Sequence, residues 1–309
     1  MFYQLLPIAI LSALIAAFIP KYRRHLRKQA IRRSHETWAI GVYEGLSPVE
    51  LGPPQGIANP VLTAADVSDV PARFVADPFM IRAGDGYYMF FEVLNGRRNL
   101  GEIGCAFSTD ATRWEYRSIV LRERFHLSYP YVFSWDGEYY MVPECSRSGG
   151  VQLYRATSFP EKWERVATLI KGDKERNALV DPSLIRHGNM WYLFSYGRNR
   201  SLYLFVAETP SGPWTEHPKS PVISGTPHYA RPGGRVISHD GGLFRYAQDE
   251  VPHYGSRVWA FRILELTPTL YREERVSDDP VIQPGREGWN RDGMHNVDPH
   301  LMPSGKWLA

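Results

Sequence analysis

Short apolar and aromatic runs alternate with tight turns along most of this chain. One such unit is ADPFMIRAGDGYYMFFE, from Ala76 to Glu92, and a similar unit is LVDPSLIRHGNMWYLFSY, from Leu179 to Tyr196. Each unit reads as two strands joined by a turn, because apolar runs flank residues that tolerate a positive φ. The pattern predicts β-hairpins with turns at Asp85-Gly86, Asp136-Gly137, Gly188-Asn189, Asp240-Gly241 and Ser304-Gly305.

The hairpins recur with a fixed spacing. Asp77, Tyr129, Asp181 and Gly233 are each 52 residues apart, and 15 residues after them stand Glu92, Glu144, Tyr196 and Gln248. Two more strand-like segments follow each hairpin, and the fourth segments are YRSIVL, RVATLI and SPVISG. Four strands in a unit of about 50 residues are typical of a propeller blade. A fifth copy begins late, at VDPHLMPSGKWLA, and the chain ends before it is complete.

The N-terminal part of the sequence carries segments that match the missing strands. Residues 38–48 (WAIGVYEGLSP) imitate residues 202–213, and residues 59–64 (NPVLTA) imitate residues 220–225 (SPVISG). We therefore expect an all-β, five-bladed β-propeller whose last blade is closed by N-terminal strands, which removes exposed sheet edges. A two-sheet sandwich with accidental internal similarity is the alternative.

The first residues of the chain differ in character from the rest. Residues 1–20 carry no charged side chain, and residues 21–33 hold seven Lys or Arg and no acid. The apolar run is close to the roughly 20 residues that cross a bilayer. We therefore expect a transmembrane anchor at 1–20, a basic juxtamembrane linker at 21–37 and the propeller at 38–309. The basic cluster puts the propeller on the cytoplasmic side; a signal peptide or an interfacial helix is the alternative.

Charge and cysteine content narrow the function classes. Residues 34–309 hold 29 Lys and Arg against 33 Asp and Glu, so the propeller is acidic although the whole chain has a net charge of +3. This charge argues against nucleic acid as a partner. The two cysteines, Cys105 and Cys145, form no zinc motif, and no nucleotide-binding motif is present. We expect neither a cofactor nor a metal, because the residues spell no ligand set; a metal ion in the central channel is the alternative.

Acidic residues recur at the ends of the predicted hairpins. Asp77 and Glu92 should lie opposite each other, and the same geometry pairs Tyr129 with Glu144 and Asp181 with Tyr196. One face of the ring would then collect the candidate residues, which are Asp77, Glu92, Tyr129, Glu144, Asp181, Arg231, Asp249, Asp298 and His300. Paired carboxylates suit glycosidic-bond chemistry, because one carboxylic acid protonates the leaving oxygen while another carboxylate activates the nucleophile.

Two structural alternatives apply to these residues. Asp-Pro can begin an inner strand for architectural reasons, since Asp caps a turn and Pro fixes φ. The second copy has Tyr-Pro and the fourth Arg-Pro, however, and a purely architectural Asp should occur in every blade. Basic residues on the same face, namely Arg231, Arg235, His228 and His295, suit an anionic group; salt bridges with acids across the ring are the alternative.

The architecture resembles the arabinanase/β-xylosidase and invertase-type glycoside hydrolases, which have Asp in blades one and three. That resemblance implies that Asp77 is the base and that Asp181 orients the substrate. Those enzymes carry their general acid on the inner strand of blade four, where this chain has ARPGGRV. Glu144 or Glu92 would then supply the proton, unless the leaving group needs none or the site binds without cleaving.

A closer resemblance covers the chain from about Trp38 onward. The motifs RFVADPFMI, FHLSYPYVFSWDGEYYMVPE, RPGGRV, AQDEVPHYG and HNVDPH occur in order. They resemble the N-terminal propeller of plant glucosamine inositolphosphorylceramide transferases and their bacterial relatives. In the plant proteins this propeller precedes a separate glycosyltransferase domain, which this sequence does not contain.

Two functions follow as expectations. The first is a membrane-anchored enzyme that acts on a glycan or glycolipid, with Asp77, Asp181 and Glu144 as catalytic residues. Its substrate-binding residues would be Glu92, Tyr129, Arg231, Asp249, His295, Asp298 and His300. The second is a non-catalytic glycan-binding propeller that serves a separate glycosyltransferase. A scaffold for protein partners is disfavoured, because the cores of protein interfaces are usually depleted of acidic residues.

Overall fold

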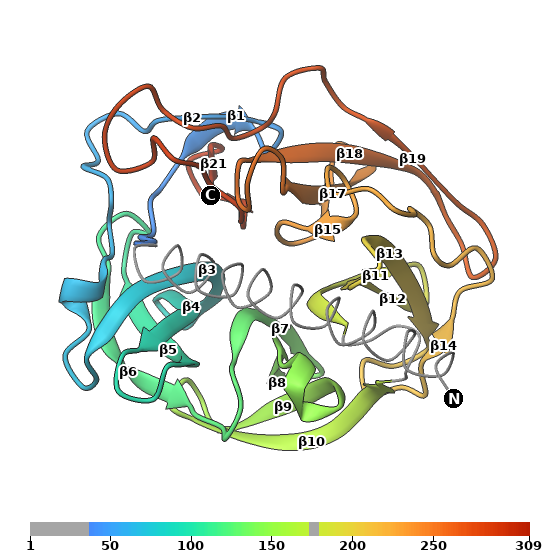
Figure 1. Cartoon of the computed structure of the whole chain (residues 1–309), viewed down its shortest axis with the longest axis horizontal. Coiled ribbons are helices and arrows are strands. Elements are labelled where there is room, and N and C mark those ends of the chain that lie inside the picture. The colour runs from blue at the N-terminus through green and yellow to red at the C-terminus, as the bar shows by residue number, and fades with distance from the viewer. Residues whose placement is uncertain (1–36, 173–178) are drawn as a thin grey trace, which may run out of the picture. The chain divides into compact units, whose positions relative to one another are not determined.

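The computed structural model describes residues 37–172 and 179–309, and residues 39–309 form one compact unit. Its strands form five antiparallel sheets arranged around a common centre (Figure 1). The structure therefore confirms the prediction of an all-β, five-bladed propeller. Helix in the described residues is limited to two 3-10 turns, η1 (Ala64–Asp66) and η2 (Ser146–Ser148).

The first three blades each contain four strands in chain order. Blade one consists of β3 (Ala72–Ala83), β4 (Gly86–Asn95), β5 (Leu100–Ser108) and β6 (Glu115–Leu121). Blade two consists of β7 (Ser128–Trp135), β8 (Glu138–Glu144), β9 (Gly150–Ser158) and β10 (Lys162–Lys171). Blade three consists of β11 (Val180–His187), β12 (Met190–Gly197), β13 (Ser201–Ala207) and β14 (Thr215–Glu216).

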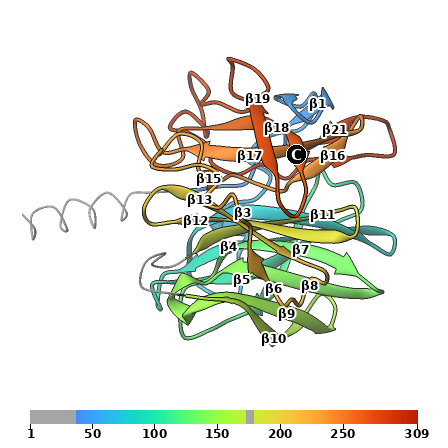
Figure 2. The same cartoon turned by 90° about the vertical axis from the view of Figure 1, so that its right-hand side faces the viewer.

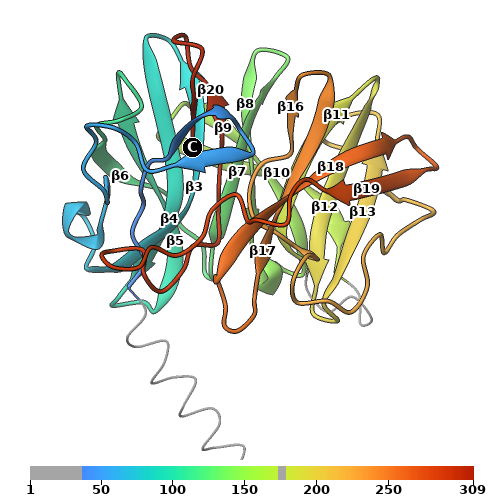
Figure 3. The ribbon, with the colours of Figure 1, turned by 90° about the horizontal axis from the view of Figure 1, so that it is seen from above.

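Blade four has a divided first strand. Both β15 (Arg231–Pro232) and β16 (Ile237–His239) pair with β17 (Gly242–Asp249), which is followed by β18 (Arg257–Leu266) and β19 (Tyr271–Arg275). Figures 2 and 3 view the ring from its side and show the strands running between its two ends. We call the end at which the first strands begin, near Asp77 and Asp181, the carboxylate face. The hairpin turns lie at the opposite face.

Blade five is built from both ends of the described chain, as predicted. Its order is β2-β1-β21-β20, where β1 (Glu44–Ser47) and β2 (Glu50–Gly52) come from the N-terminal side. The C-terminal side supplies β20 (His300–Leu301) and β21 (Trp307–Leu308). Hydrogen bonds between Tyr43 and Ala309, 2.9 Å long in both directions, join the two ends.

One detail of the predicted closure was wrong. The outer strand of blade five is β2, and residues 59–64 form only an isolated bridge between Leu62 and Ile40. Residues 220–225 do the same in blade three, where Ile223 bridges Leu202. Proline precedes each bridge, at Pro60 and Pro221, and proline cannot donate a hydrogen bond to extend the ladder. The similarity of the two segments therefore marks this shared bridge, not a fourth strand.

Aromatic side chains fill the space between blades one and two. Phe159 of blade two lies with its ring centroid 5.0 Å from Tyr88 and 5.9 Å from Phe90, both in blade one. Trp163 contacts Phe90 edge to face at 5.4 Å. Such pairs contribute burial and about 0.5–1.5 kcal/mol each beyond it. These aromatic residues therefore serve packing between blades one and two.

A guanidinium group joins the blades at the centre of the ring. Arg235, which follows β15, donates to the carbonyl oxygens of Met80 in blade one (3.2 Å) and Val132 in blade two (3.0 Å). Its Nε donates to Asp298 Oδ1 at 2.7 Å, next to blade five. Asp298 Oδ2 also accepts from Met80 N at 2.6 Å and from His300 Nε2 at 2.8 Å.

The charge pair at the centre is nearly excluded from water. Burial by itself raises the pKa of Asp298, but Arg235 and His300 outweigh it and lower that pKa to about 2. Asp298 therefore stays ionised and holds blades one, four and five together. Asp298 and His300 thus have a structural role, and the contact with substrate that the sequence suggests stays a prediction for both.

The transmembrane anchor expected at 1–20 and nearly all of the linker at 21–37 lie outside the described residues. Within 37–172 and 179–309, no helix is long and apolar enough to cross a bilayer.

We predict that Arg235→Gln destabilises the fold by about 3–5 kcal/mol, because it leaves the buried Asp298 carboxylate without its cation. Urea unfolding of the full chain measures this loss. Arg113→Gln, at an exposed turn on the opposite face, should change stability by less than about 0.5 kcal/mol. Adding Asp298→Asn should restore part of the loss, since the two sites are in contact. A loss below about 1 kcal/mol in Arg235→Gln would show that the ring does not depend on this pair.

Candidate functional site

Three equivalent residues at the starts of the inner strands have unusual backbone conformations. Asp77, Tyr129 and Asp181 have φ values of 53°, 46° and 51°, in the left-handed region. A non-glycine residue there costs about 1–3 kcal/mol, and such strain is concentrated at functional sites. In the fourth copy Gly234 has φ 145°, and a Cβ there would lie 1.8 Å from the carbonyl oxygen of Val297. Only glycine fits that position.

These residues lie in β-bulges, which corrects the predicted pairing by one residue. The cross-strand partner of Glu92 is Ala76, that of Glu144 is Ser128, and that of Tyr196 is Val180. The register shifts immediately after each pair, because the inner strand holds extra residues that the second strand lacks. Asp77 and Asp181 therefore project from the bulges instead of lying directly opposite the second strand.

Four carboxyl groups from three blades converge on the carboxylate face. All four side chains are buried, with exposed fractions between 2% and 8%: Asp77, Glu92, Glu144 and Asp181. The charges of Asp77 and Glu144 raise the pKa of Asp181 and also that of Glu92, so all four groups lie within electrostatic reach of one another. We call these four residues the carboxylate cluster. The structure thus brings together the acids that the repeat predicts on one face.

Asp181 titrates close to neutral pH. Burial raises its pKa most, the Arg231 guanidinium opposes this effect, and Asp77 and Glu144 raise the pKa further, to about 6. Arg231 Nε donates to Asp181 Oδ2 at 2.5 Å, and Gln248 Nε2 donates to the same oxygen at 3.2 Å.

Glu92 is paired with a histidine that the repeat does not reveal. His126 Nδ1 accepts a hydrogen bond from Gly101 N at 2.9 Å, so a neutral His126 carries its proton on Nε2. That Nε2 lies 3.1 Å from Glu92 Oε1. Burial raises the pKa of Glu92, His126 opposes the effect, and Asp77 and Glu144 add to it. His126 lies in the connection before β7, outside the repeated hairpin, so no spacing signal marks it.

Asp77 is held by two further segments. Oδ2 accepts from Tyr129 N at 3.3 Å, and Oδ1 lies 3.2 Å from His295 Nδ1. The His295 ring lies 5.0 Å from Tyr254, a 37% exposed side chain from the loop after β17. Tyr254 belongs to the AQDEVPHYG motif but is not among the residues predicted from the sequence.

The two arginines that suited an anionic ligand are bound to carboxylates within the protein. Arg231 contacts Asp181 and also Glu250, whose Oε1 lies 3.1 Å from Nη1. The rings of Tyr196 and Tyr254 lie 5.7 Å and 4.9 Å from its guanidinium. Arg235 contacts Asp298, as described above. The salt-bridge alternative therefore describes Arg231 and Arg235 correctly.

The Tyr129 hydroxyl is directed into the ring. It accepts from Gly234 N at 2.7 Å, donates to Gly234 O at 3.0 Å and lies 2.8 Å from Ser183 Oγ. The side chain is 1% exposed. Tyr129 therefore joins blades two, three and four, and a contact with substrate stays a prediction for this residue.

Asp249 lies at the rim of the carboxylate face and apart from the cluster. Its carboxylate accepts from Trp259 Nε1 at 3.1 Å and Val251 N at 2.9 Å, and lies 3.0 Å from His228 Nδ1. The leading influences on the pKa values of Asp181 and Glu92 are burial and other charged groups, not Asp249 or Asp298.

Two buried amide oxygens beside the cluster lack donors. Gln248 Oε1 and Asn296 Oδ1 have no hydrogen-bond partner within the described part of the chain. Their amide nitrogens are used, by Asp181 and by Pro78 O (2.9 Å), which fixes their orientation. Buried acceptors of this kind normally have a partner, so both oxygens have unused hydrogen-bonding capacity. No three His, Cys, Asp or Glu side chains in residues 37–172 and 179–309 are grouped as metal ligands.

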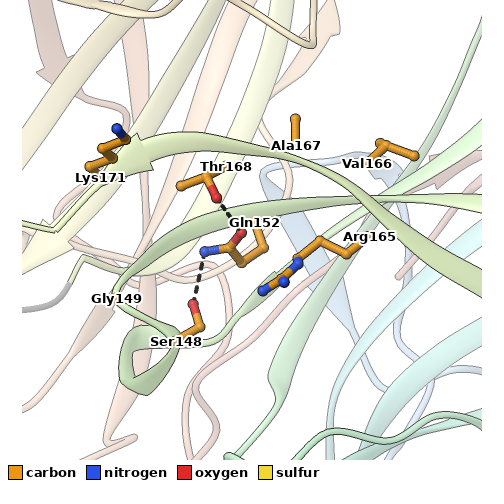
Figure 4. Close-up of a pocket in the computed structure, with 8 residues that line it drawn as sticks. All are labelled: Ser148, Gly149, Gln152, Arg165, Val166, Ala167, Thr168 and Lys171. Carbon is orange, nitrogen blue, oxygen red and sulfur yellow. Dashed lines mark hydrogen bonds between the residues drawn. The ribbon is translucent and has the colours of Figure 1, made fainter.

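A pocket of about 460 Å³ lies elsewhere, on the outer strands of blade two (Figure 4). Its polar centre is Gln152, which donates to Ser148 Oγ at 3.0 Å and accepts from Thr168 Oγ1 at 2.8 Å. Figure 4 shows Val166 and Ala167 on the far side of β10 from these groups. The lining contains none of the residues that the sequence predicts to be functional.

Solved structures share this architecture. A β-xylosidase, RS223, superimposes with a TM-score of 0.55 at 15% identity over 69% of this chain and 77% of its own. An α-L-arabinanase of Cellvibrio cellulosa complexed with arabinohexaose gives 0.53 at 16% identity, over 75% and 87%. Zg3597, a family 117 glycoside hydrolase of Zobellia galactanivorans, gives 0.53 at 17% identity, over 76% and 83%. At these identities the likeness shows the fold alone.

Curated relatives match by sequence. Glucosamine inositolphosphorylceramide transferase 1 of rice (Oryza sativa subsp. japonica) is 37% identical over 297 residues, and that of Arabidopsis thaliana is 34% identical over 297 residues. Each alignment covers 88% of this chain but only 39% and 38% of the relative, so the chain spans about two-fifths of their length. The family model "Glucosamine inositolphosphorylceramide transferase 1, N-terminal" matches residues 32–309, and the chain belongs to that family.

Proposed function

We propose that the carboxylate face is the site of a carbohydrate-active protein that hydrolyses or transfers a sugar on a glycan or glycolipid. The observation that carries this proposal is the convergence of four buried carboxyl groups, two of them with raised pKa values. Glycosidic-bond chemistry needs an ionised and a protonated carboxyl group in one site, and such environments provide both. The curated relatives are named glucosamine inositolphosphorylceramide transferase 1, and these names support the same class.

In this proposal Asp77 is the base. It removes the proton from the attacking hydroxyl group or water while a second carboxyl group gives its proton to the leaving oxygen, so one proton is taken up and one released. Asp181, paired with Arg231, orients the substrate. Gln248 and Asn296 accept hydrogen bonds from sugar hydroxyls beside these carboxylates.

Two residues compete for the role of the acid. Glu144 is the partner named from the sequence, and its Oε2 accepts from Ser128 Oγ at 3.3 Å. Glu92 has the raised pKa that an acid needs, because burial and two neighbouring carboxylates disfavour its ionised form. The raised pKa favours Glu92, and the two assignments make different predictions for substrates with different leaving groups.

A second function is supported by the length of the match. The chain corresponds to 39% of the rice relative, and the matching family model is an N-terminal region. A propeller that binds a glycan and presents it to a separate glycosyltransferase would need the same hydroxyl acceptors. Such a binding propeller would need no general acid.

We further propose that residues 1–20 anchor the chain in a membrane with the propeller on the cytoplasmic side. This rests on the uncharged run at 1–20 and the seven basic residues at 21–33. A glycolipid substrate would then share the membrane with the protein.

We predict that Asp77→Asn lowers kcat/KM by about 10²–10⁴-fold, since the amide cannot accept a proton. Release of 4-nitrophenol from a panel of aryl glycosides by the purified full chain measures the rate, and circular dichroism checks the fold. Asp85→Asn, at the exposed turn of the same hairpin, should leave the rate unchanged. Full activity in Asp77→Asn would overturn the assignment. Thermal stabilisation by sugars without any aryl release would favour the binding module.

The acid can be identified by comparing leaving groups. We predict that Glu92→Gln nearly abolishes cleavage of alkyl glycosides but retains cleavage of 2,4-dinitrophenyl glycosides, because that leaving group needs no protonation. Glu144→Gln is the comparison. The same selective loss in Glu144→Gln, with Glu92→Gln unaffected, would assign the acid to Glu144 instead.

The ionisation of Asp181 can be measured without a substrate. Its folded-state pKa of about 6 lies above the unfolded value near 3.8, so the folded protein binds the extra proton between these pH values. Its contribution to stability is therefore complete below pH 4 and falls as pH rises to 6, by about 3 kcal/mol. Asp181→Asn removes this pH-dependent contribution to the free energy of unfolding. The free energy of unfolding of the wild type minus that of the variant should fall from pH 4 to 7; a constant difference would contradict the raised pKa.

A further inference from the structure

The basic groups near the carboxylate cluster are engaged by its acids. Arg231 contacts Asp181 and Glu250, His295 lies against Asp77, and His126 lies against Glu92. The centre of the carboxylate face thus holds more carboxylates than cations. A phosphate or carboxylate group of a substrate would be repelled there, because like charges at close range in a buried site are costly.

Arg257 at the rim of the same face is different. It is the first residue of β18, and its cross-strand partner is Asp249 at the end of β17. Its side chain is 37% exposed, while its Nε is buried and has no hydrogen-bond partner among the described residues. The nearest carboxylate oxygen, Asp249 Oδ2, is 3.9 Å from Nε, which is too far for a hydrogen bond.

Asp249 cannot easily move closer to Arg257, because other donors hold its carboxylate. Trp259 Nε1 and Val251 N donate to it at 3.1 and 2.9 Å. His228 Nδ1 lies 3.0 Å from Oδ1 and is a donor there, since a carboxylate can only accept. This contact orients the imidazole so that Nε2 is the free ring nitrogen, on a side chain that is 42% exposed. Arg257 and the oriented His228 imidazole therefore flank one carboxylate that three other contacts already hold.

The rim group is continuous with the carboxylate cluster. Glu250, the residue after Asp249, accepts from Arg231 Nη1 at 3.1 Å and from Tyr196 OH at 2.8 Å. Arg231 in turn contacts Asp181. A substrate that places a sugar at the cluster can therefore extend to the rim between blades three and four.

We propose that Arg257 and His228 form an oxyanion subsite that binds a phosphate or carboxylate group of the substrate. The guanidinium Nη groups of Arg257 donate to two oxygens of the anion, a geometry that guanidinium offers and ammonium does not. His228, which contacts the other oxygen of Asp249, uses its Nε2 to contact the hydroxyl or protonated oxygen next to the charge. The link to a sugar rests on the proposed function, but binding of the anion itself does not.

The test is isothermal titration calorimetry of the purified full chain. The titrants are glucose 1-phosphate, inorganic phosphate and acetate, each up to about 10 mM. Arg257→Gln should weaken phosphate binding by about tenfold or more, since a charge-assisted hydrogen bond is lost. Arg257→Lys should weaken phosphate binding less than Arg257→Gln does. His228→Asn should weaken the binding of glucose 1-phosphate more than the binding of inorganic phosphate. Arg113→Gln, which removes the same charge at the opposite face, should have no effect. Circular dichroism checks that each variant is folded.

Flotation with vesicles separates two sources of the anion. Vesicles of phosphatidylcholine with phosphatidylinositol are compared with phosphatidylcholine alone, in wild type and Arg257→Gln. Loss of only the phosphatidylinositol-dependent binding in the variant assigns a lipid headgroup, whereas loss of only soluble phosphate binding assigns a free sugar phosphate. If Arg257→Gln binds both the soluble anions and the phosphatidylinositol vesicles as tightly as the wild type does, or if the wild type binds neither, the subsite is overturned. Asp77→Asn should retain phosphate binding, so a failure of the glycosidic assignment can be told apart from a failure of this one.

Discussion

The buried ion pair between Arg235 and Asp298 is the contact on which the ring depends. Arg235 reaches carbonyl oxygens in blades one and two, and Asp298 accepts from the Met80 amide while it holds His300. In a site of low dielectric, either partner alone would be an uncompensated charge. The pair therefore fixes where the inner strands of blades one and two pass the axis. Asp77, three residues before Met80, takes its place on the carboxylate face from this constraint.

The starts of the inner strands add strain to this arrangement. Positive φ at Asp77, Tyr129 and Asp181 is unfavourable. The fold tolerates this strain because hydrogen bonds between blades hold the bulges in place. The Tyr129 hydroxyl binds Gly234 and its amide binds Asp77, so one strained residue connects blade two to blades one and four. Strain and mutual repulsion of carboxylates occur at the same place. Both lower the stability of the fold, and residues with a purely architectural role would require neither.

The charges of the carboxylate face divide into two regions. At the centre, burial and neighbouring carboxylates raise the pKa of Asp181 to about 6 and also raise the pKa of Glu92. At the rim, other donors hold Asp249, and Arg257, whose side chain is 37% exposed, has a buried Nε without a hydrogen-bond partner among the described residues. A neutral sugar suits the first region and an anionic group the second. This division gives a bound substrate a direction across the face, from the axis toward blade four.

Much of the fold and part of the site could be predicted from the sequence, because a hairpin is a local structure. Turn residues and the 52-residue period fix which residues end each strand, so Asp77, Glu92, Glu144 and Asp181 were expected on one face. The matching of the two chain ends predicted the closure of blade five for the same reason. The bulges were not foreseen, since a one-residue shift in register depends on which hydrogen bonds the neighbouring blades supply.

Only the tertiary structure decided which charged groups are partners and which additional residues reach the site. His126, Glu250 and Tyr254 lie in connections that have no period, and nothing in their spacing places them near an acid. The sequence does not distinguish Arg235 from Arg257. In the structure, Arg235 is held by Asp298 and two carbonyl oxygens, whereas Arg257 remains partly exposed. Contacts such as Met80 with Asp298 span 218 residues, and chain folding alone brings such groups together.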